Sequence, residues 1–232
     1  MGKYTYLLIN ICSIAIPLLF SFERRMRFYK NFSALFPALF ITGVFFILWD
    51  HFMTIRNVWA FNPDFILGIY IWELPLEEWL FFFTIPYSCM FVYTSMNHLV
   101  KSDISPKISI NISRLLFVVV TVTAVLNAGK LYTGIKLSLT GMALLYCMIK
   151  NPEYMGKFYR SYLICLIPFF IVNGILTALP VVTYNNQENL GIRLGTIPVE
   201  DTMYMLLLLV MNTILFEFFK TRQQQNENTI SY

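Results

Sequence analysis

The sequence predicts an all-α, polytopic membrane protein with about seven transmembrane helices, built from two parallel repeats of the same orientation. The 232-residue chain is 57% hydrophobic and only 13% charged, whereas soluble domains carry about 25% charged residues. It contains several apolar runs of about 18 residues or more, the length that crosses a bilayer as a helix. A segment of one half also recurs in the other, so the architecture is repeated.

The repeated segment occurs each time directly before a long apolar run. Residues 68–79 read GIYIWELPLEEW, and residues 191–202 read GIRLGTIPVEDT. Both copies begin with Gly-Ile, and both contain a proline, one apolar residue and then two acids. With a constant offset of 123 residues, the acids correspond in pairs: Glu77 to Glu200, and Glu78 to Asp201.

The apolar runs set the expected order of elements along the chain. We expect spans at residues 4–21, 33–53, 75–99, 115–128, 131–149, 161–182 and 198–219. The domains follow as a first repeat at 1–100, a linking span at 101–130, a second repeat at 131–222 and a tail at 223–232. The first run is too long and too aromatic for a cleaved signal peptide. The tail is polar and poor in apolar residues, so we expect it to be disordered.

The basic residues predict the orientation. The loops after spans one, three and five, together with the tail, hold twelve Lys and Arg residues, and the other side holds five. By the positive-inside rule, the N-terminus lies outside and the C-terminus inside, and we expect a bacterial inner (cytoplasmic) membrane. The net charge of +4 follows from these loops and indicates no nucleic-acid partner. The four cysteines show neither disulfide nor zinc spacing.

The paired acids have two interpretations. A proline and acids in the first turn make an ordinary helix start, since the acids suit the positive end of the helix dipole. However, ionisable groups near hydrocarbon are costly and usually functional. Two equivalent pairs at the same membrane face would build one site between the halves. We therefore take Glu77, Glu78, Glu200 and Asp201 as catalytic candidates.

Other polar and aromatic residues near the acids are weaker candidates for binding a substrate. They are Trp79, Trp72, Trp59, Asn62, Asp50 and Tyr204. Ring faces beside a proton-donating carboxyl would stabilise a carbocation, although lipid-facing or packing aromatics explain any single ring as well. Asn173 is the nearest equivalent of Asp50 in the second half, and a helix–helix hydrogen bond would account for it.

The duplicated Pro-x-Glu-Glu/Asp motif at the start of apolar helices resembles the membrane-integral lycopene cyclase family. The segments 74–82 (LPLEEWLFF) and 57–63 (NVWAFNP) both look like the first half of that family. The resemblance covers residues 1–222 and implies that the four motif acids are essential. The second half departs more, with Thr202 and Met203 where the first copy has Trp79 and Leu80.

The resemblance implies a proton-initiated cyclisation of the ψ-ends of lycopene to β-rings, an isomerase-type reaction with no net redox change and no cofactor. The absence of dinucleotide, phosphate-loop and metal-ligand motifs agrees with that. The expected partners are lycopene and the lipid bilayer, with other carotenoid-pathway enzymes or a second copy of the chain as further candidates. Three alternatives stay open: an ε-cyclase, a hydratase, or a non-enzymatic membrane transporter or scaffold.

Overall fold

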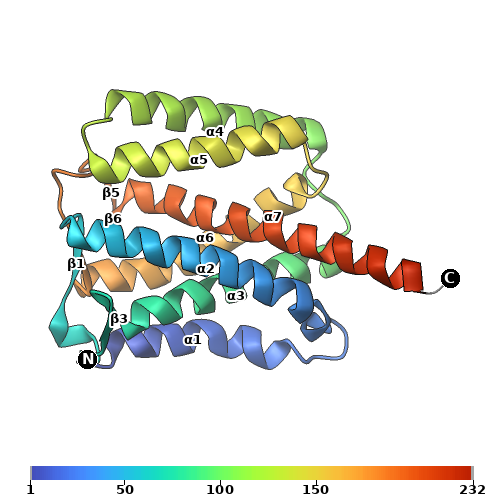
Figure 1. Cartoon of the computed structure of the whole chain (residues 1–232), viewed down its shortest axis with the longest axis horizontal. Coiled ribbons are helices and arrows are strands. Elements are labelled where there is room, and N and C mark those ends of the chain that lie inside the picture. Colours follow the sequence, from blue (N-terminus) through green and yellow to red (C-terminus); the bar gives the residue numbers. More distant parts are fainter. Residues whose placement is uncertain (1, 231–232) are drawn as a thin grey trace.

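The computed structural model describes residues 2–230, and over that range the chain forms seven α-helices and three two-stranded sheets. The helices are α1 (Thr5–Phe20), α2 (Phe32–Ile55), α3 (Leu76–Leu99), α4 (Pro106–Leu126), α5 (Leu131–Lys150), α6 (Met155–Ala178) and α7 (Val199–Ile230). Short 3-10 helices, η1 (Phe28–Asn31) and η2 (Pro63–Phe65), lie in loops. The helices form one bundle with the two termini at opposite ends (Figure 1).

The helices present an apolar surface to the surroundings. Within the described residues, α2 to α7 are long and apolar enough to cross a membrane, and α1 is an apolar helix of 16 residues. Large apolar side chains point outward, among them Phe40, Val125 and Ile167, each more than half exposed. Helices suit a bilayer because they satisfy their own backbone hydrogen bonds. The chain is an integral membrane protein, and the predicted fold class is confirmed.

Three helices differ from the sequence prediction by more than three residues at a boundary. α6 spans Met155–Ala178 rather than residues 161–182. α4 begins at Pro106 rather than near residue 115, because the Ser105 side chain accepts a hydrogen bond from the Ile108 N–H at 3.4 Å and Pro106 suits the first turn. α7 continues to Ile230 through the segment expected to be disordered. Glutamine is a good helix former, and Gln223 accepts a hydrogen bond from Ser33 at 3.1 Å. Residues 231 and 232 lie outside the described residues.

The two repeats pack against each other in matching pairs of helices. Within the repeats, α1 packs on α3 and α5 packs on α7. Between the repeats, α2 packs on α7 and α3 packs on α6. The α1–α3 contact corresponds to α5–α7, and the α2–α7 contact corresponds to α3–α6. The two halves are therefore related by a two-fold axis that runs along the bundle. α4 lies outside this arrangement, against α5 and α6.

A pair of strands joins the halves at one end of the bundle. β1 (Trp59–Phe61) and β4 (Val182–Tyr184) are antiparallel, with Ala60 opposite Thr183. These two residues are 123 positions apart, so the strand pair lies on the two-fold axis itself. Although the second half lacks the Asn-x-Trp sequence, it has the equivalent strand, with Val182 where the first half has Trp59.

The repeated segment forms a small hairpin that leads directly into a long helix. In the first half β2 (Tyr70–Ile71) pairs with β3 (Leu74–Pro75), and in the second β5 (Arg193–Leu194) pairs with β6 (Ile197–Pro198). Gly68 and Gly191 begin the two copies with φ of 83° and 73°, which glycine adopts without steric cost. Both hairpins lie at the end that carries β1 and β4 (Figure 1), so both acid pairs enter from the same face.

Candidate active site

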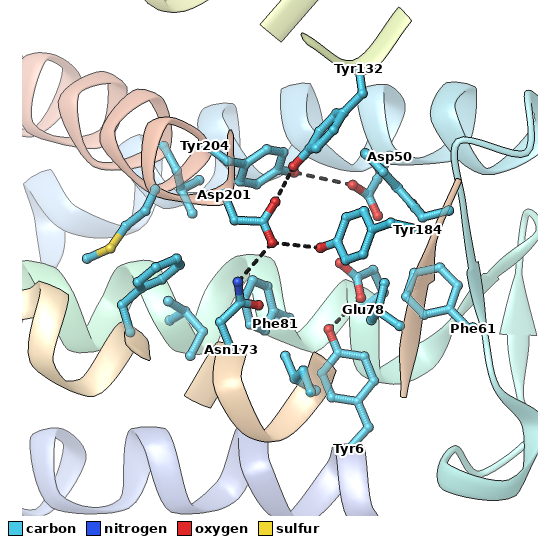
Figure 2. A pocket seen from close by; sticks show the side chains of 17 residues that line it. Tyr6, Asp50, Phe61, Glu78, Phe81, Tyr132, Asn173, Tyr184, Asp201 and Tyr204 are labelled. Atoms are coloured by element: carbon cyan, nitrogen blue, oxygen red, sulfur yellow. Dashed lines mark hydrogen bonds between the residues drawn. The ribbon is translucent and has the colours of Figure 1, made fainter. Parts of the chain in front are cut away.

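A cavity lies beneath the β1–β4 strand pair and between the halves (Figure 2). Of the seven α-helices in the described part of the chain, six line it and α4 does not. Its lining residues are Tyr6, Asp50, Trp59, Phe61, Glu78, Phe81, Ile85, Tyr132, Phe169, Asn173, Leu176, Val182, Tyr184, Asp201, Tyr204, Met205 and Leu208. The cavity therefore combines carboxyl groups from both repeats with many aromatic and aliphatic side chains.

The two neighbouring acids of each motif point to different places, because adjacent helical residues are about 100° apart around the axis. Glu78 and Asp201 line the cavity. Glu77 and Glu200 are buried but bind the preceding loops: Glu77 Oε1 accepts the Leu67 N–H at 2.7 Å, and Glu200 Oε1 accepts the N–H of the equivalent residue, 190, at 2.6 Å. Of the four predicted acids, one from each pair reaches the cavity.

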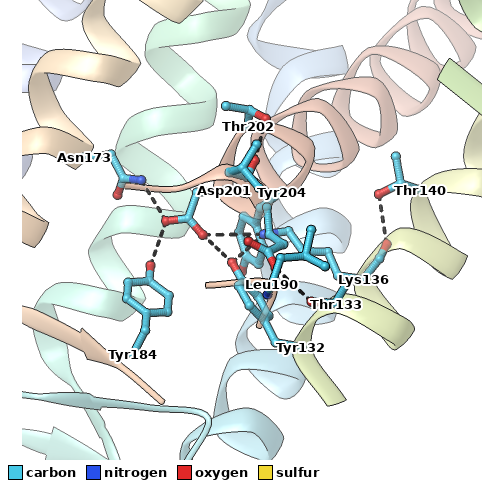
Figure 3. Close-up of polar contacts among 12 residues, drawn as sticks. Tyr132, Thr133, Lys136, Thr140, Asn173, Tyr184, Leu190, Asp201, Thr202 and Tyr204 are labelled. Carbon is cyan, nitrogen blue, oxygen red and sulfur yellow. Dashed lines mark hydrogen bonds and ion pairs between the residues drawn. The ribbon is translucent and has the colours of Figure 1, made fainter. Parts of the chain in front are cut away.

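Asp201 is surrounded by hydrogen-bond donors (Figure 3). Its Oδ1 accepts from the Tyr132 hydroxyl and lies 3.6 Å from Lys136 Nζ. Its Oδ2 accepts from the Tyr184 hydroxyl at 2.8 Å and from Asn173 Nδ2 at 2.9 Å. Lys136 is fully buried, and its Nζ also lies 4.1 Å from the centroid of the Tyr132 ring. Both oxygens of the Asp201 carboxyl group therefore face hydrogen-bond donors, and one of them also faces a buried lysine.

Tyr184, on strand β4, remains a neutral donor to Asp201. Burial raises the pKa of the Tyr184 hydroxyl well above its usual value, and the nearby Asp201 charge raises it further. Both effects disfavour a second anion in a poorly solvated place. Tyr184 therefore keeps its proton and directs it at Asp201.

The environment of Glu78 is less rich in donors. Glu78 Oε2 accepts from the Tyr6 hydroxyl of α1. Asp50 of α2 is buried beside it, and its Oδ1 accepts from the Tyr204 hydroxyl at 3.3 Å. Asp50 and Glu78 line the same cavity, and within the described residues no cation pairs with either of them. The donors to these two carboxyl groups are tyrosine hydroxyls.

The weaker candidates divide equally between the cavity and its surroundings. Trp59, Asp50 and Tyr204 line the cavity, as proposed substrate-binding residues should. Trp72 is exposed at the β2–β3 turn and packs on Trp79, with ring centroids 5.7 Å apart. Asn62 accepts the Asp64 N–H at 3.0 Å and begins η2. Trp72, Trp79 and Asn62 thus have structural contacts away from the cavity lining.

Several residues of the site were missed by the sequence analysis, namely Tyr6, Tyr132, Lys136 and Tyr184. A signal for some of them exists in the sequence. Lysine inside an apolar span is rare and usually functional, and Lys136 lies within the predicted fifth span. The first and fifth spans also share a tyrosine followed four residues later by a polar residue.

Comparison with known proteins adds one finding. A family model described as lycopene cyclase matches residues 3–96 and 129–219. The match comprises both repeats and leaves out the segment that contains α4. No match is found among curated proteins or among solved structures.

Proposed function

Because the chain belongs to the lycopene cyclase family, we propose that it closes the ψ-ends of lycopene into β-rings, with Glu78 and Asp201 as the groups that exchange protons with the substrate. One observation carries this proposal. The two repeats place three carboxyl groups in a single cavity, Asp50 and Glu78 from the first and Asp201 from the second, and the rest of the lining is largely apolar and aromatic.

The reaction needs only protons and a water-poor cavity. A carboxylic acid adds a proton to the terminal double bond of the ψ-end, which leaves a tertiary carbocation. A second double bond attacks this cation and closes a six-membered ring. A carboxylate then removes a proton from a carbon next to the new cationic centre, which forms the ring double bond. Product and substrate are isomers, so the reaction consumes no oxidant or reductant.

The aromatic lining supports the cationic steps. The rings of Trp59, Phe61, Phe81, Phe169 and Tyr204 all line the cavity with the two acids. A cation over an aromatic face gains about 0.5–2 kcal/mol, more when water is excluded. The lining also keeps bulk water from capturing the cation, and this favours a cyclic hydrocarbon over a hydrated product.

The proposal is tested by expression in a bacterium that accumulates lycopene, followed by pigment analysis. We expect the cells to change from red to yellow-orange, with β-ring products of the same mass as lycopene. Glu78→Gln keeps the size of the side chain and should lower the rate about 10²–10⁴-fold, the usual contribution of a general acid or base. Glu153→Gln, an exposed residue between α5 and α6, is the matched control and should remain active.

Other outcomes would point to the alternatives. Products heavier than lycopene by one or two waters would indicate a hydratase, and ε-rings would indicate another position of proton loss. Unchanged lycopene with the chain inserted in the membrane would contradict the proposed activity.

A further inference from the structure

The two acid sites of the cavity have equivalent positions in the repeats but differ in charge. Each has a tyrosine donor on the first helix of its repeat, Tyr6 in one and Tyr132 in the other. Four residues after that tyrosine, the first repeat has Asn10 and the second has Lys136. Asn10 is neutral and donates to the backbone oxygens of Tyr6 and Glu77 at 3.2 and 3.1 Å. A positive charge thus stands at only one of these two positions.

Asp201 lies on the side with the positive charge. Its polar contacts are Lys136 and three neutral donors, Tyr132, Tyr184 and Asn173. Each carboxylate oxygen therefore faces donors. Lys136 is fully buried, and a buried cation requires a nearby anion. Among the residues that the structure describes, the acidic side chain paired with Lys136 is Asp201, so the two side chains form a buried ion pair.

Glu78 lies on the side where carboxyl groups face each other. Its Oε2 accepts from the Tyr6 hydroxyl, and the carboxyl group of Asp50 lines the same cavity. Asp50 is 3% exposed, and its Oδ2 lacks a hydrogen-bonding partner within the described residues. Within the described residues the ion pair of Lys136 is with Asp201, and no cation pairs with Asp50 or Glu78. Two such carboxyls cannot both be ionised in an apolar cavity, so one proton is retained between them.

We propose that Lys136 is a positioning residue that gives the carboxyl groups of the cavity different roles. It keeps Asp201 ionised as the proton acceptor and leaves the Asp50–Glu78 pair as the proton donor. We call this assignment of roles the division. This inference rests on the proposed function. Asp50 thereby becomes a proton-holding residue of the reaction, and the two repeats, alike in fold, perform opposite halves of the proton transfer.

The proposed steps balance in protons and in electron pairs. The Asp50–Glu78 pair gives its proton to the terminal double bond, whose electron pair forms the new C–H bond. The electron pair of the second double bond then forms the C–C bond of the ring. Asp201 takes a proton from a carbon beside the cationic centre, and the electrons of that C–H bond form the ring double bond. Between turnovers Asp201 gives its proton to the solvent and the pair takes one from the solvent, so the cycle consumes no protons.

The division predicts that changes on the two sides have different consequences for the product. Without the donor, no cation forms, so the rate falls but the ring type of any residual product is unchanged. Without a fixed acceptor, cations still form but lose protons from other carbons or are captured by water. A variant of the acceptor side should therefore yield a mixture of ring types and hydrated rings.

The test uses isolated membranes that contain the full chain, supplied with lycopene, and measures both the initial rate and the ring type of the products. Asp50→Asn represents the donor side. Lys136→Met, Asp201→Asn and their double variant represent the acceptor side. The double variant replaces the ion pair by two neutral side chains and avoids the unpaired buried charge that destabilises each single variant. Lys130→Met is the control, because Lys130 lies on the same side of the bundle and contacts the Asn189 backbone oxygen at 2.8 Å.

We expect Lys136→Met to lower the rate about 10- to 100-fold, as the loss of a charged partner in a buried ion pair does, and to yield the mixed products. The double variant should give the same mixture, since both changes remove one function. Asp50→Asn should lower the rate without changing the ring type. Acceptor-side variants with a single unchanged ring type would overturn the division, while an active wild type would leave the proposed function intact. A wild type that forms no ring would instead contradict the proposed function.

Discussion

At the scale of the residue, the account depends on which of two adjacent acids faces the cavity. Glu78 and Asp201 reach it, whereas Glu77 and Glu200 receive backbone N–H groups of the preceding loops. The loop contacts fix the hairpins that begin α3 and α7. We therefore expect the two glutamates to support the site by fixing the loops and hairpins before α3 and α7.

Glu77→Gln should therefore affect stability more than chemistry. The change weakens a buried hydrogen bond to a charged group, worth about 1.5–3 kcal/mol, and should lower the thermal unfolding temperature of the purified chain. The remaining activity should exceed that of Glu78→Gln. Glu73→Gln, exposed in the β2–β3 turn, should change neither property. Loss of activity in Glu77→Gln at wild-type stability would place Glu77 in the proton transfer.

Several residues that line the cavity could be proposed from the sequence, because a chain with few ionisable residues makes each of them conspicuous. The repeat and the scarcity of ionisable groups identify both acid pairs, and the aromatic candidates include Trp59 and Tyr204. The sequence does not show which acid of a pair faces inward, because that depends on helix rotation. It also does not reveal the contacts of Tyr184 with Asp201, because a single tyrosine in an outer loop resembles any interfacial ring.

At the scale of the element, the helices are positioned by a few close backbone contacts as well as by side chains. Gly156, in the first turn of α6, lies against the loop before α4. A Cβ atom at Gly156 would lie 2.1 Å from the backbone oxygen of Ile104 and 3.2 Å from its carbonyl carbon. Only glycine permits this approach without movement of the backbone.

Gly156→Ala should accordingly destabilise the junction of α4 and α6. Overpacking of this kind costs about 1–3 kcal/mol, which a thermal unfolding measurement on the purified chain can detect. Gly129→Ala is the matched control, because a Cβ at Gly129 meets no atom within 4 Å. Equal stability of the two variants would show that the α4–α6 junction adapts freely.

At the scale of the whole molecule, the two-fold relation of the repeats explains why both motif acid pairs lie at the same end of the bundle. Equivalent helices have the same direction, so equivalent motifs enter from the same face. The strand pair β1–β4 closes that face over the cavity. The orientation of this face in the membrane remains a prediction from the basic residues.

The orientation is tested with single cysteines in a chain whose exposed Cys12 is replaced by serine; the other three cysteines are buried. Asn186→Cys, near the cavity end, should react with a membrane-impermeant maleimide added to intact cells. Lys101→Cys, after α3, should react only after the membrane is permeabilised. The reverse pattern would invert the topology but would leave both acids at the same face.

The most direct test of the central claim is cyclisation by the purified wild-type chain in heavy water, with mass analysis of the product. If carboxyl groups that exchange with solvent start the reaction, each new ring carries one deuterium, and Glu78→Gln forms rings far more slowly. Rings that form at the normal rate without deuterium would contradict the account, because no proton from the cavity acids would have entered the product.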